Sequence, residues 1–184
     1  MSSRRSFIKR SGVALSYILG GASVMMTPAD AREQDVPLQV FSKKEVLTLE
    51  ALAEAIVPGA RQAGICHYLD HHLAQGPEDC LLMIKYLGLP PQAYTSFYQS
   101  GLDNASKHAK SRFHKQWSAL KTEQGTLLLE DMVNDKIPAW QSAPASFFFF
   151  VLRSDASDLV YGTVEGFEGI DFPYMPHITP EVSW

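Results

Sequence analysis

Residues 42–59 read SKKEVLTLEALAEAIVPG, and this stretch decides the fold class. Ser42 and Glu45 have the spacing of a capping box, in which each side chain binds a free backbone N–H at a helix start. Apolar residues then recur at helical spacing until Pro58 and Gly59 interrupt the pattern, at Val46, Leu49, Ala53, Ile56 and Val57. The stretch therefore predicts an amphipathic helix that begins after Ser42 and ends before Pro58.

The same periodicity continues downstream. It predicts further helices over 64–75, 78–87, 91–117 with a weak point at Gly101, 122–135, and from Ser142 to Leu159 with Pro144 in the first turn. Alternation with a period of two, which is typical of strands, is almost absent. We therefore expect an all-α domain of about six helices over residues 42–161, preceded by a polar linker over 32–41.

The C-terminal residues 162–184 have a different character. Glycines, prolines and large apolar residues occur there without either period, so we expect an irregular extended arm that packs on its own domain or on a partner. Together with the aromatic run of the last helix, the arm exposes more apolar side chains than one core needs. The expected partner interface comprises Phe147, Phe148, Phe150, Tyr161, Phe172, Tyr174, Met175, His177 and Trp184.

The first 31 residues resemble an export signal. A basic segment with two arginines precedes a short apolar run, Gly12 to Met26, and a small-residue cleavage site at Ala29 and Ala31. The apolar run is shorter than the ~20 residues that span a bilayer core. Paired arginines in this context are typical of the twin-arginine route, which carries folded proteins. The residues that we expect the export machinery to recognise are Arg4, Arg5, Phe7 and Lys9. The bond after Ala31 is the expected cleavage site, the sequence leaves open whether the signal is removed, and we expect a periplasmic location.

Charge and cysteine content narrow the possible partners. The formal net charge is −4, and the first 31 residues hold four of the 16 basic residues but one of the 20 acidic ones. A nucleic-acid partner is therefore disfavoured. In an oxidising periplasm Cys66 and Cys80 have three alternatives: a bridge to each other, a bridge to another subunit, or two buried thiols.

Catalytic motifs are not found. There is no glycine-rich phosphate loop, no haem-attachment motif and no nucleophile elbow. His67 and His71 lie one helical turn apart and could share a metal ion, and His177 is a candidate acid or base. Because these motifs are missing, we expect no catalytic or cofactor-binding residue in this chain. Because no third ligand follows from the sequence, we expect no metal-binding residue either. A stand-alone periplasmic enzyme or metal-binding protein that uses these histidines is the alternative.

Several short motifs in this order resemble the gluconate 2-dehydrogenase subunit 3 family. They are the helix Leu49 to Gly59, the pair Ala63-Gly64, Tyr68-Leu69-Asp70, the helix from Phe147 to Arg153, and Val160-Tyr161-Gly162 with Phe172-Pro173. The chain departs from the family pattern at Gly162-Thr163-Val164, where many members have Gly-Gly-Asn, and in its longer tail. Because of these departures we limit the expected substrate class to a sugar or a sugar acid.

The resemblance implies a function. Members of this family are non-catalytic small subunits of membrane-associated periplasmic dehydrogenases. They bind a large FAD-containing subunit of the glucose-methanol-choline type, often with a cytochrome c subunit that carries haem. The resemblance implies that this chain holds no FAD itself, that its signal takes the folded large subunit through the twin-arginine translocase, and that its body stabilises that subunit. A helical binding module for an unrelated exported protein is a further alternative.

Overall fold

The structure is a computed structural model that describes residues 14–171, without the side chains of Val164 and Glu165. Some of the predicted functional residues lie outside this range. They are Arg4, Arg5, Phe7 and Lys9 of the expected export signal, and Phe172, Tyr174, Met175, His177 and Trp184 of the expected arm.

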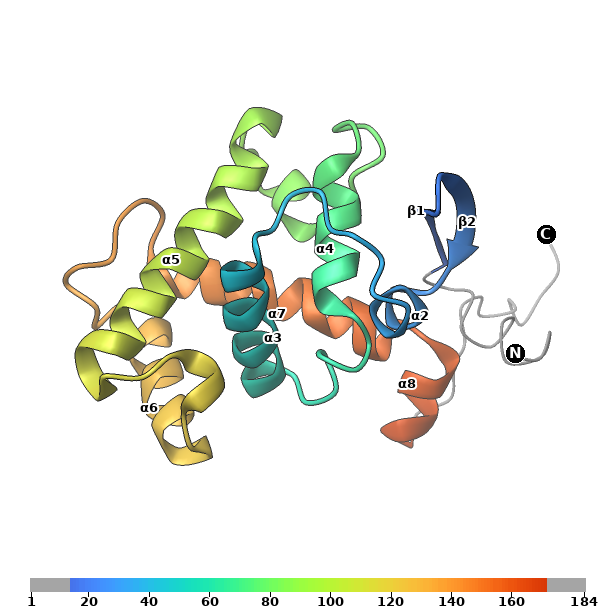
Figure 1. Cartoon of the computed structure of the whole chain (residues 1–184). Helices are drawn as coiled ribbons and strands as arrows, with labels where there is room; N and C mark the ends of the chain where they lie inside the picture. Colours follow the sequence, from blue (N-terminus) through green and yellow to red (C-terminus); the bar gives the residue numbers. More distant parts are fainter. Residues whose placement is uncertain (1–13, 172–184) are drawn as a thin grey trace, which may run out of the picture.

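The body of the protein, residues 42–161, is a cluster of helices around one long central helix (Figure 1). The central helix α7 contacts each of the other four long helices of the body, and most of the buried apolar side chains lie between them. The all-α prediction is confirmed. The body consists of α3 (Lys43–Ile56), α4 (Ile65–Ala74), η2 (Met83–Leu87), η3 (Pro91–Ala93), α5 (Tyr94–Phe113), η4 (Trp117–Ala119), α6 (Thr122–Val133) and α7 (Ala145–Tyr161).

Helix α3 begins as its sequence predicts. The Ser42 hydroxyl accepts a hydrogen bond from the Glu45 N–H, and the Glu45 carboxylate accepts one from the Ser42 N–H at 2.8 Å. Leu49, Leu52 and Ala53 form the fully buried face of this helix. The capping box and the apolar stripe therefore act together, because the cap sets the start of the helix and the stripe sets the face that packs.

Gly101 is the point of closest approach between α5 and α7. A Cβ atom at this position would lie 2.3 Å from the ring of Phe148, which is itself fully buried. The Phe148 ring also packs against Phe97 and Trp140. The residue that weakens the predicted helix is therefore the one that lets an aromatic ring reach the backbone of α5.

The predicted helix over residues 78–87 is wrong. The chain forms a turn at Pro77 to Asp79 and then the short 3-10 helix η2. Leu82 and Ile84 are both fully buried, a spacing of two that an α-helix would place on different faces. The Met83 N–H donates to the Asp155 carboxylate at 2.7 Å in place of a helical acceptor. Tertiary contacts with α7 therefore override the local helical pattern.

Residues 14–33 differ from the expectation that the first 31 residues contribute no structure. Strands β1 (Leu15–Leu19) and β2 (Ala22–Met26) form an antiparallel hairpin, and helix α2 (Pro28–Glu33) follows it. Gly20 and Gly21, at the turn, have φ values of 60° and 83°. A two-residue turn with positive φ at both positions is typical of tight hairpins, so two adjacent glycines explain why an apolar segment folds back on itself here.

Residues 34–41 also differ from the expected polar linker. Val36 and Phe41 are buried, and Asp70 of helix α4 fixes the backbone between them. Its carboxylate accepts hydrogen bonds from three consecutive N–H groups, those of Gln39 at 2.8 Å, Val40 at 2.8 Å and Phe41 at 3.1 Å. We call residues 14–41, from the hairpin to this segment, the N-terminal unit.

The predicted extended arm is helical where the structure describes it. After Gly162 the chain forms helix α8 (Val164–Gly169), and the Thr163 hydroxyl caps it by accepting the Gly166 N–H at 3.0 Å. A threonine at the N-cap satisfies one of the free N–H groups of a helix start, and here it makes a short helix possible despite two glycines. Residues 172–184 of the arm lie outside the described range.

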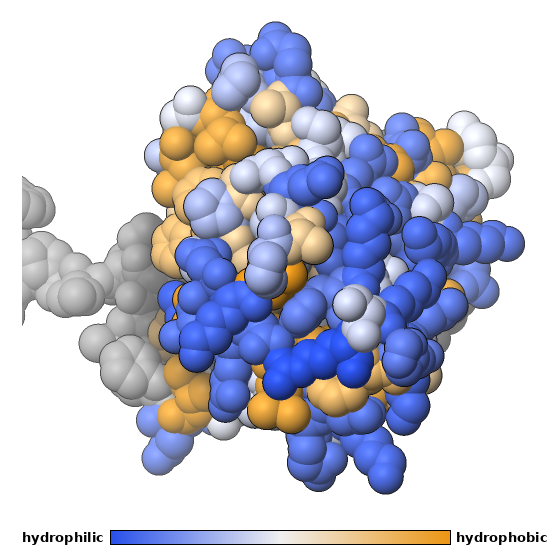
Figure 2. Space-filling view, turned by 90° about the vertical axis from the view of Figure 1, so that its left-hand side faces the viewer, coloured by the Kyte–Doolittle hydropathy of each residue, from blue (hydrophilic) through white to orange (hydrophobic). Residues whose placement is uncertain are grey.

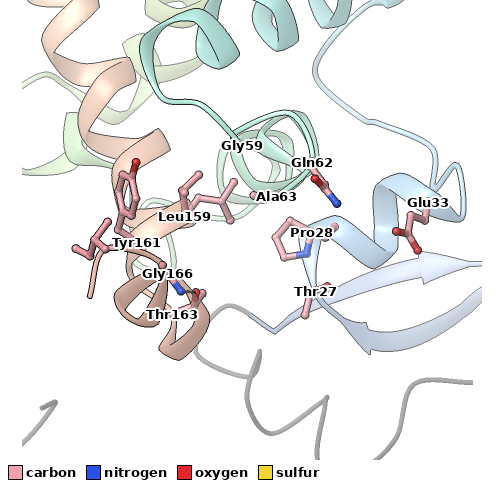
Figure 3. Close-up of a pocket in the computed structure, with 14 residues that line it drawn as sticks. Thr27, Pro28, Glu33, Gly59, Gln62, Ala63, Leu159, Tyr161, Thr163 and Gly166 are labelled. Atoms are coloured by element: carbon pink, nitrogen blue, oxygen red, sulfur yellow. Dashed lines mark hydrogen bonds between the residues drawn. The ribbon is translucent and has the colours of Figure 1, made fainter. Parts of the chain in front are cut away.

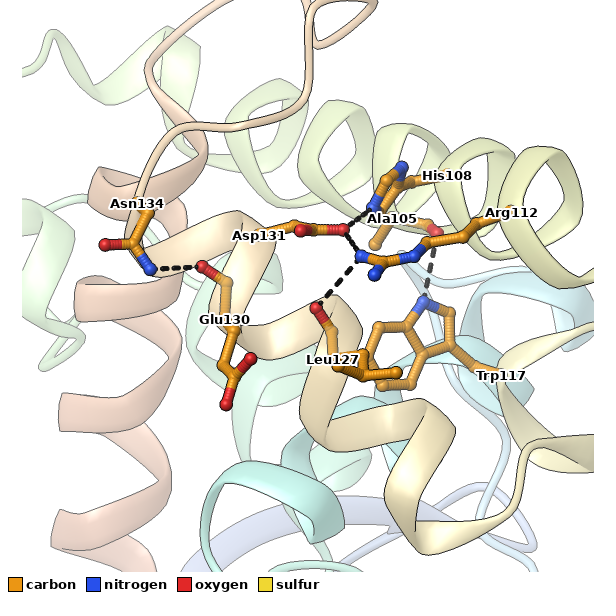
Figure 4. Close-up of polar contacts among 8 residues, drawn as sticks. All are labelled: Ala105, His108, Arg112, Trp117, Leu127, Glu130, Asp131 and Asn134. Carbon is orange, nitrogen blue, oxygen red and sulfur yellow. Dashed lines mark hydrogen bonds and ion pairs between the residues drawn. The ribbon is translucent and has the colours of Figure 1, made fainter.

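Polar contacts join α6 to α5 at the end of the body remote from the hairpin. The Asp131 carboxylate pairs with Arg112 and accepts a hydrogen bond from Nε2 of His108 at 2.9 Å (Figure 4). The Trp117 indole donates to the Ala105 carbonyl at 3.0 Å. Figure 2 shows this end of the molecule as largely hydrophilic, with separate apolar areas. Across residues 14–171, no helix has the length and apolar content needed to cross a membrane.

Candidate functional site: a cleft beside helix α2 and the end of α7

A cleft of about 500 Å³ lies between the N-terminal unit and the C-terminal end of α7. Thr27 and Pro28 at the start of α2 line one side, and Tyr161 and Thr163 line the other (Figure 3). Residues of the turn between α3 and α4 form the floor, among them Gly59 and Ala63. Three segments that are far apart in the sequence therefore build the cleft together.

Residues of three of the short motifs that carry the family resemblance line this cleft, namely Gly59, Ala63 and Val160. Gly59 lies so close to α7 that a Cβ at this position would be 3.9 Å from a methyl group of Val160. Gly59 has a φ of 94°, which allows the chain to turn here, and the Glu54 carboxylate holds the turn by accepting the N–H groups of Gly59 and Arg61, both at 2.9 Å. No motif by itself predicts this approach of Gly59 to Val160.

The lining of the cleft is poor in catalytic groups. The hydroxyls of Thr27 and Thr163 are occupied as helix caps, accepting the N–H groups of Asp30 and Gly166. Among the lining residues, Glu33 supplies a carboxylate and Tyr161 a phenol, and none is a histidine, cysteine or serine. A nucleophile paired with a base is not formed by these residues. The lining residues mainly offer apolar walls with few polar groups.

The histidines of α4 are mostly committed to structural contacts. Nε2 of His67 donates to the Val36 carbonyl at 3.0 Å, and its Nδ1 is buried without a hydrogen-bond partner. Burial lowers the pKa of His67 and His71, and lowers the pKa of His72 to about 4. The His71 ring packs on Tyr17 with centroids 5.3 Å apart. Within residues 14–171, no three histidine, cysteine or acidic side chains are grouped around a common metal position.

Asp155 of α7 is a buried carboxyl group that no sequence motif marks as special. It accepts hydrogen bonds from the Tyr98 hydroxyl at 2.5 Å and the Met83 N–H at 2.7 Å, and its exposed fraction is 1%. Burial raises the pKa of Asp155 to about 7. The carboxyl group joins α7 to α5 and η2 through these two hydrogen bonds, so its geometry indicates a structural role.

Cys66 and Cys80 are both buried, free thiols in the structure, and no bond joins them. The Cys66 thiol donates to the Val46 carbonyl, and burial raises the pKa of both thiols. A buried thiol with a raised pKa is a poor nucleophile, because the thiolate is the reactive form.

The aromatic residues expected at the partner interface differ in how far they are buried. Phe148 is fully buried in the core, so its prediction as an interface residue is wrong, because its place opposite Gly101 needs the ring inside. Phe147 is half-buried and packs on Phe97. Phe150 is 38% exposed, and Tyr161 is half-buried at the edge of the cleft. Of these residues, Phe150 is the one whose ring is most available to a partner.

Comparison with known protein families agrees with this arrangement. The sequence model of the family gluconate 2-dehydrogenase subunit 3 matches residues 43–176. The chain belongs to the gluconate 2-dehydrogenase subunit 3 family. The matched range starts at α3 and covers the whole helical body, whereas the N-terminal unit precedes it. Neither the curated proteins nor the solved structures include a significant match to this chain.

Membership of this family has a direct consequence for function. The family is named for the third subunit of gluconate 2-dehydrogenase, so this chain is related to a subunit of a multi-subunit dehydrogenase complex. The fold and the cleft are consistent with an accessory subunit of such a complex.

Proposed function

We propose that this chain is the non-catalytic small subunit of a periplasmic, FAD-dependent dehydrogenase that oxidises a sugar or sugar acid. In this proposal it binds a large flavin-containing subunit, holds no FAD itself, and takes that subunit through the twin-arginine translocase. The observation that carries the proposal is the family match over residues 43–176.

The chemistry of the described residues supports an accessory role. The cleft beside α2 offers apolar walls and capping hydroxyls, and the most strongly perturbed carboxyl group, Asp155, is enclosed by Tyr98 and Met83. Structural networks of buried groups also perturb the pKa of a carboxyl group, which fits a role of Asp155 within the fold. The redox chemistry of the complex therefore belongs, in this proposal, to the flavin of the large subunit.

The export arrangement has a physical rationale. A flavin is inserted while its protein folds in the cytoplasm, so a flavoprotein without its own signal has to cross the membrane already folded. The paired residues Arg4 and Arg5 would supply the signal for the folded complex. A third subunit with haem c would receive the electrons.

Co-purification tests the proposal. The chain is produced with the products of its neighbouring genes, purified through a C-terminal tag, and its visible absorption spectrum is recorded. We expect a large subunit to co-purify with flavin absorption bands. A colourless, monomeric chain, together with an active flavoprotein exported in its absence, would contradict the proposal.

Two matched variants sharpen this experiment. Replacing the exposed ring in Phe150→Asp is expected to reduce the recovered flavin, because a charge placed on an apolar contact opposes binding. Leu47→Asp introduces the same charge on α3 at a site of similar exposure, 51%, and is expected to leave recovery unchanged. In cells, Arg4→Lys with Arg5→Lys is expected to retain the flavoprotein in the cytoplasm.

A further inference from the structure

The expected cleavage site of the export signal lies inside a folded helix. Ala31 of α2 is fully buried. Its N–H donates to the Thr27 carbonyl at 2.9 Å, and its carbonyl accepts the Val36 N–H at 3.0 Å. The bond between Ala31 and Arg32 therefore has its neighbouring backbone groups paired within the chain.

Helix α2 is docked against the body through backbone contact. Gly64, the N-cap of α4, has a φ of 86°, and a Cβ atom there would lie 2.2 Å from the Pro28 carbonyl oxygen. Only glycine allows this approach. Arg32, on the other side of the bond, pairs with Glu50 of α3 at 2.9 Å. Both flanks of the bond are thus held by helices of the body.

Side chains of the N-terminal unit enclose the same helix. Ala31 belongs to a small apolar cluster with Tyr17 and Met26 of the hairpin and Val36 of the following segment. The Tyr17 hydroxyl donates to the His67 carbonyl at 3.2 Å, which joins this cluster to α4. Cleavage after Ala31 would remove three of the four members and expose Val36.

Proteases act on chain segments whose backbone is exposed, and they reach a folded site through its transient opening. The twin-arginine route delivers a protein that is already folded, so a cleavage site within the fold stays protected during export. We propose that docking of α2 on Gly64 protects the Ala31–Arg32 bond, so that the folded protein keeps residues 1–31 after export. The inference rests on the proposed export signal and adds that residues 14–31 of this signal remain part of the folded protein.

Purified full-length protein, incubated with bacterial leader peptidase in detergent, tests the proposal. Intact mass reports the loss of residues 1–31, and a synthetic peptide of residues 1–40 serves as the unfolded comparator. We expect the peptide to be cut after Ala31 and the wild-type chain to be cut at least about tenfold more slowly.

Two variants are expected to open the site. Gly64→Ala adds a methyl group against Pro28 and should raise the rate toward that of the peptide. Its matched control is Gly88→Ala, where φ is also positive, at 76°, but nothing lies within 4 Å of the added atom. Val36→Asp is a second opening variant, which disrupts the apolar cluster without altering the cleavage site or α4. Circular dichroism verifies that the helical body is retained.

Trypsin, which cuts after Arg32, gives a second readout that needs no signal recognition. We expect the wild-type chain to resist cleavage there and Gly64→Ala to be cut faster. A wild-type chain cut by leader peptidase as fast as the peptide would overturn the proposal. A peptide that leader peptidase leaves intact would overturn it for a different reason, since the proposed signal itself would be wrong, even if trypsin still showed α2 docked.

Discussion

The helical body and the N-terminal unit are stabilised in different ways. The body has one large apolar core around α7, whereas the N-terminal unit has a four-residue cluster and depends on groups that the body supplies. The body contributes the Asp70 carboxylate, the Glu50 carboxylate and the bare backbone at Gly64. An isolated hairpin is marginally stable at best, so the N-terminal unit should fold only on a body that is already formed.

The largest expected effect comes from the core. Phe148→Ala should lower the free energy of unfolding by about 3–5 kcal/mol, because it removes a buried ring and leaves a cavity between α5 and α7. Denaturant unfolding followed by tryptophan fluorescence measures the change. Phe150→Ala, with an exposed ring on the same helix, is the control and should stay within about 0.5 kcal/mol of wild type. Similar losses of unfolding free energy in both variants would show that the buried face of α7 contributes no more to stability than its exposed face.

The pH dependence of stability should separate two buried groups. An unfolded chain protonates His72 below pH 6.5, whereas the folded chain resists protonation until about pH 4, so acidification through this range lowers stability. Asp155 has the opposite sign, because its folded pKa of about 7 lies above the unfolded value of 3.8 and stability rises as pH falls between them.

Asp155→Asn removes this compensation. As the pH falls from 6.5 to 4, the variant should lose unfolding free energy more steeply than wild type, because both keep the buried histidines and only wild type keeps Asp155. Unfolding curves at several pH values measure the slope, with Asp103→Asn, an exposed carboxylate, as the control. Identical slopes for Asp155→Asn and wild type would contradict the raised pKa of Asp155.

A smaller and local effect is expected at the boundary between the two regions. Asp70→Ala leaves the N–H groups of residues 39–41 without an acceptor and should cost about 2 kcal/mol, since water reaches part of this segment. Hydrogen exchange should accelerate at residues 39–41 and in α2 before it does in α7. Uniform acceleration throughout the chain would show that the N-terminal unit and the body unfold as one.

The smallest effect concerns the approach of α5 to α7. Gly101→Ala places a methyl group 2.3 Å from the Phe148 ring and should cost about 1–2 kcal/mol by forcing the ring to move. Gly76→Ala, where nothing lies within 4 Å, is the control. In combination with Phe148→Leu the cost of Gly101→Ala should shrink, and a strictly additive result would argue against direct contact.

The sequence predicted the body far better than its surroundings. Helices α3, α4, α5, α6 and α7 all follow from apolar spacing and local caps, with Ser42 and Glu45 as the clearest case. The sequence analysis does not predict the hairpin, although Gly20-Gly21 between apolar segments is a recognised turn signal, because the same segment has the pattern of an export signal. Residues 78–87 were predicted wrongly because Leu82 and Ile84 obey tertiary packing and not local periodicity.

The candidate site could be predicted only in part. Gly59, Ala63 and Val160 belong to short family motifs, but the cleft that they line together joins residues about a hundred positions apart in the chain, which no local pattern encodes. The sequence also does not predict the roles of Asp155 and Asp70, since each carboxylate binds backbone or hydroxyl groups that are distant in sequence.

By itself, the sequence determined the fold class, the principal helices and the family, because helix caps and apolar spacing act over a few residues and are visible wherever they occur. The tertiary structure alone decided that Gly101 admits the ring of Phe148, that Gly64 admits the backbone of α2, and that Ala31 is enclosed. These features depend on which surfaces meet when the helices pack. The packing of the whole core determines which surfaces meet, so no single stretch of residues predicts them.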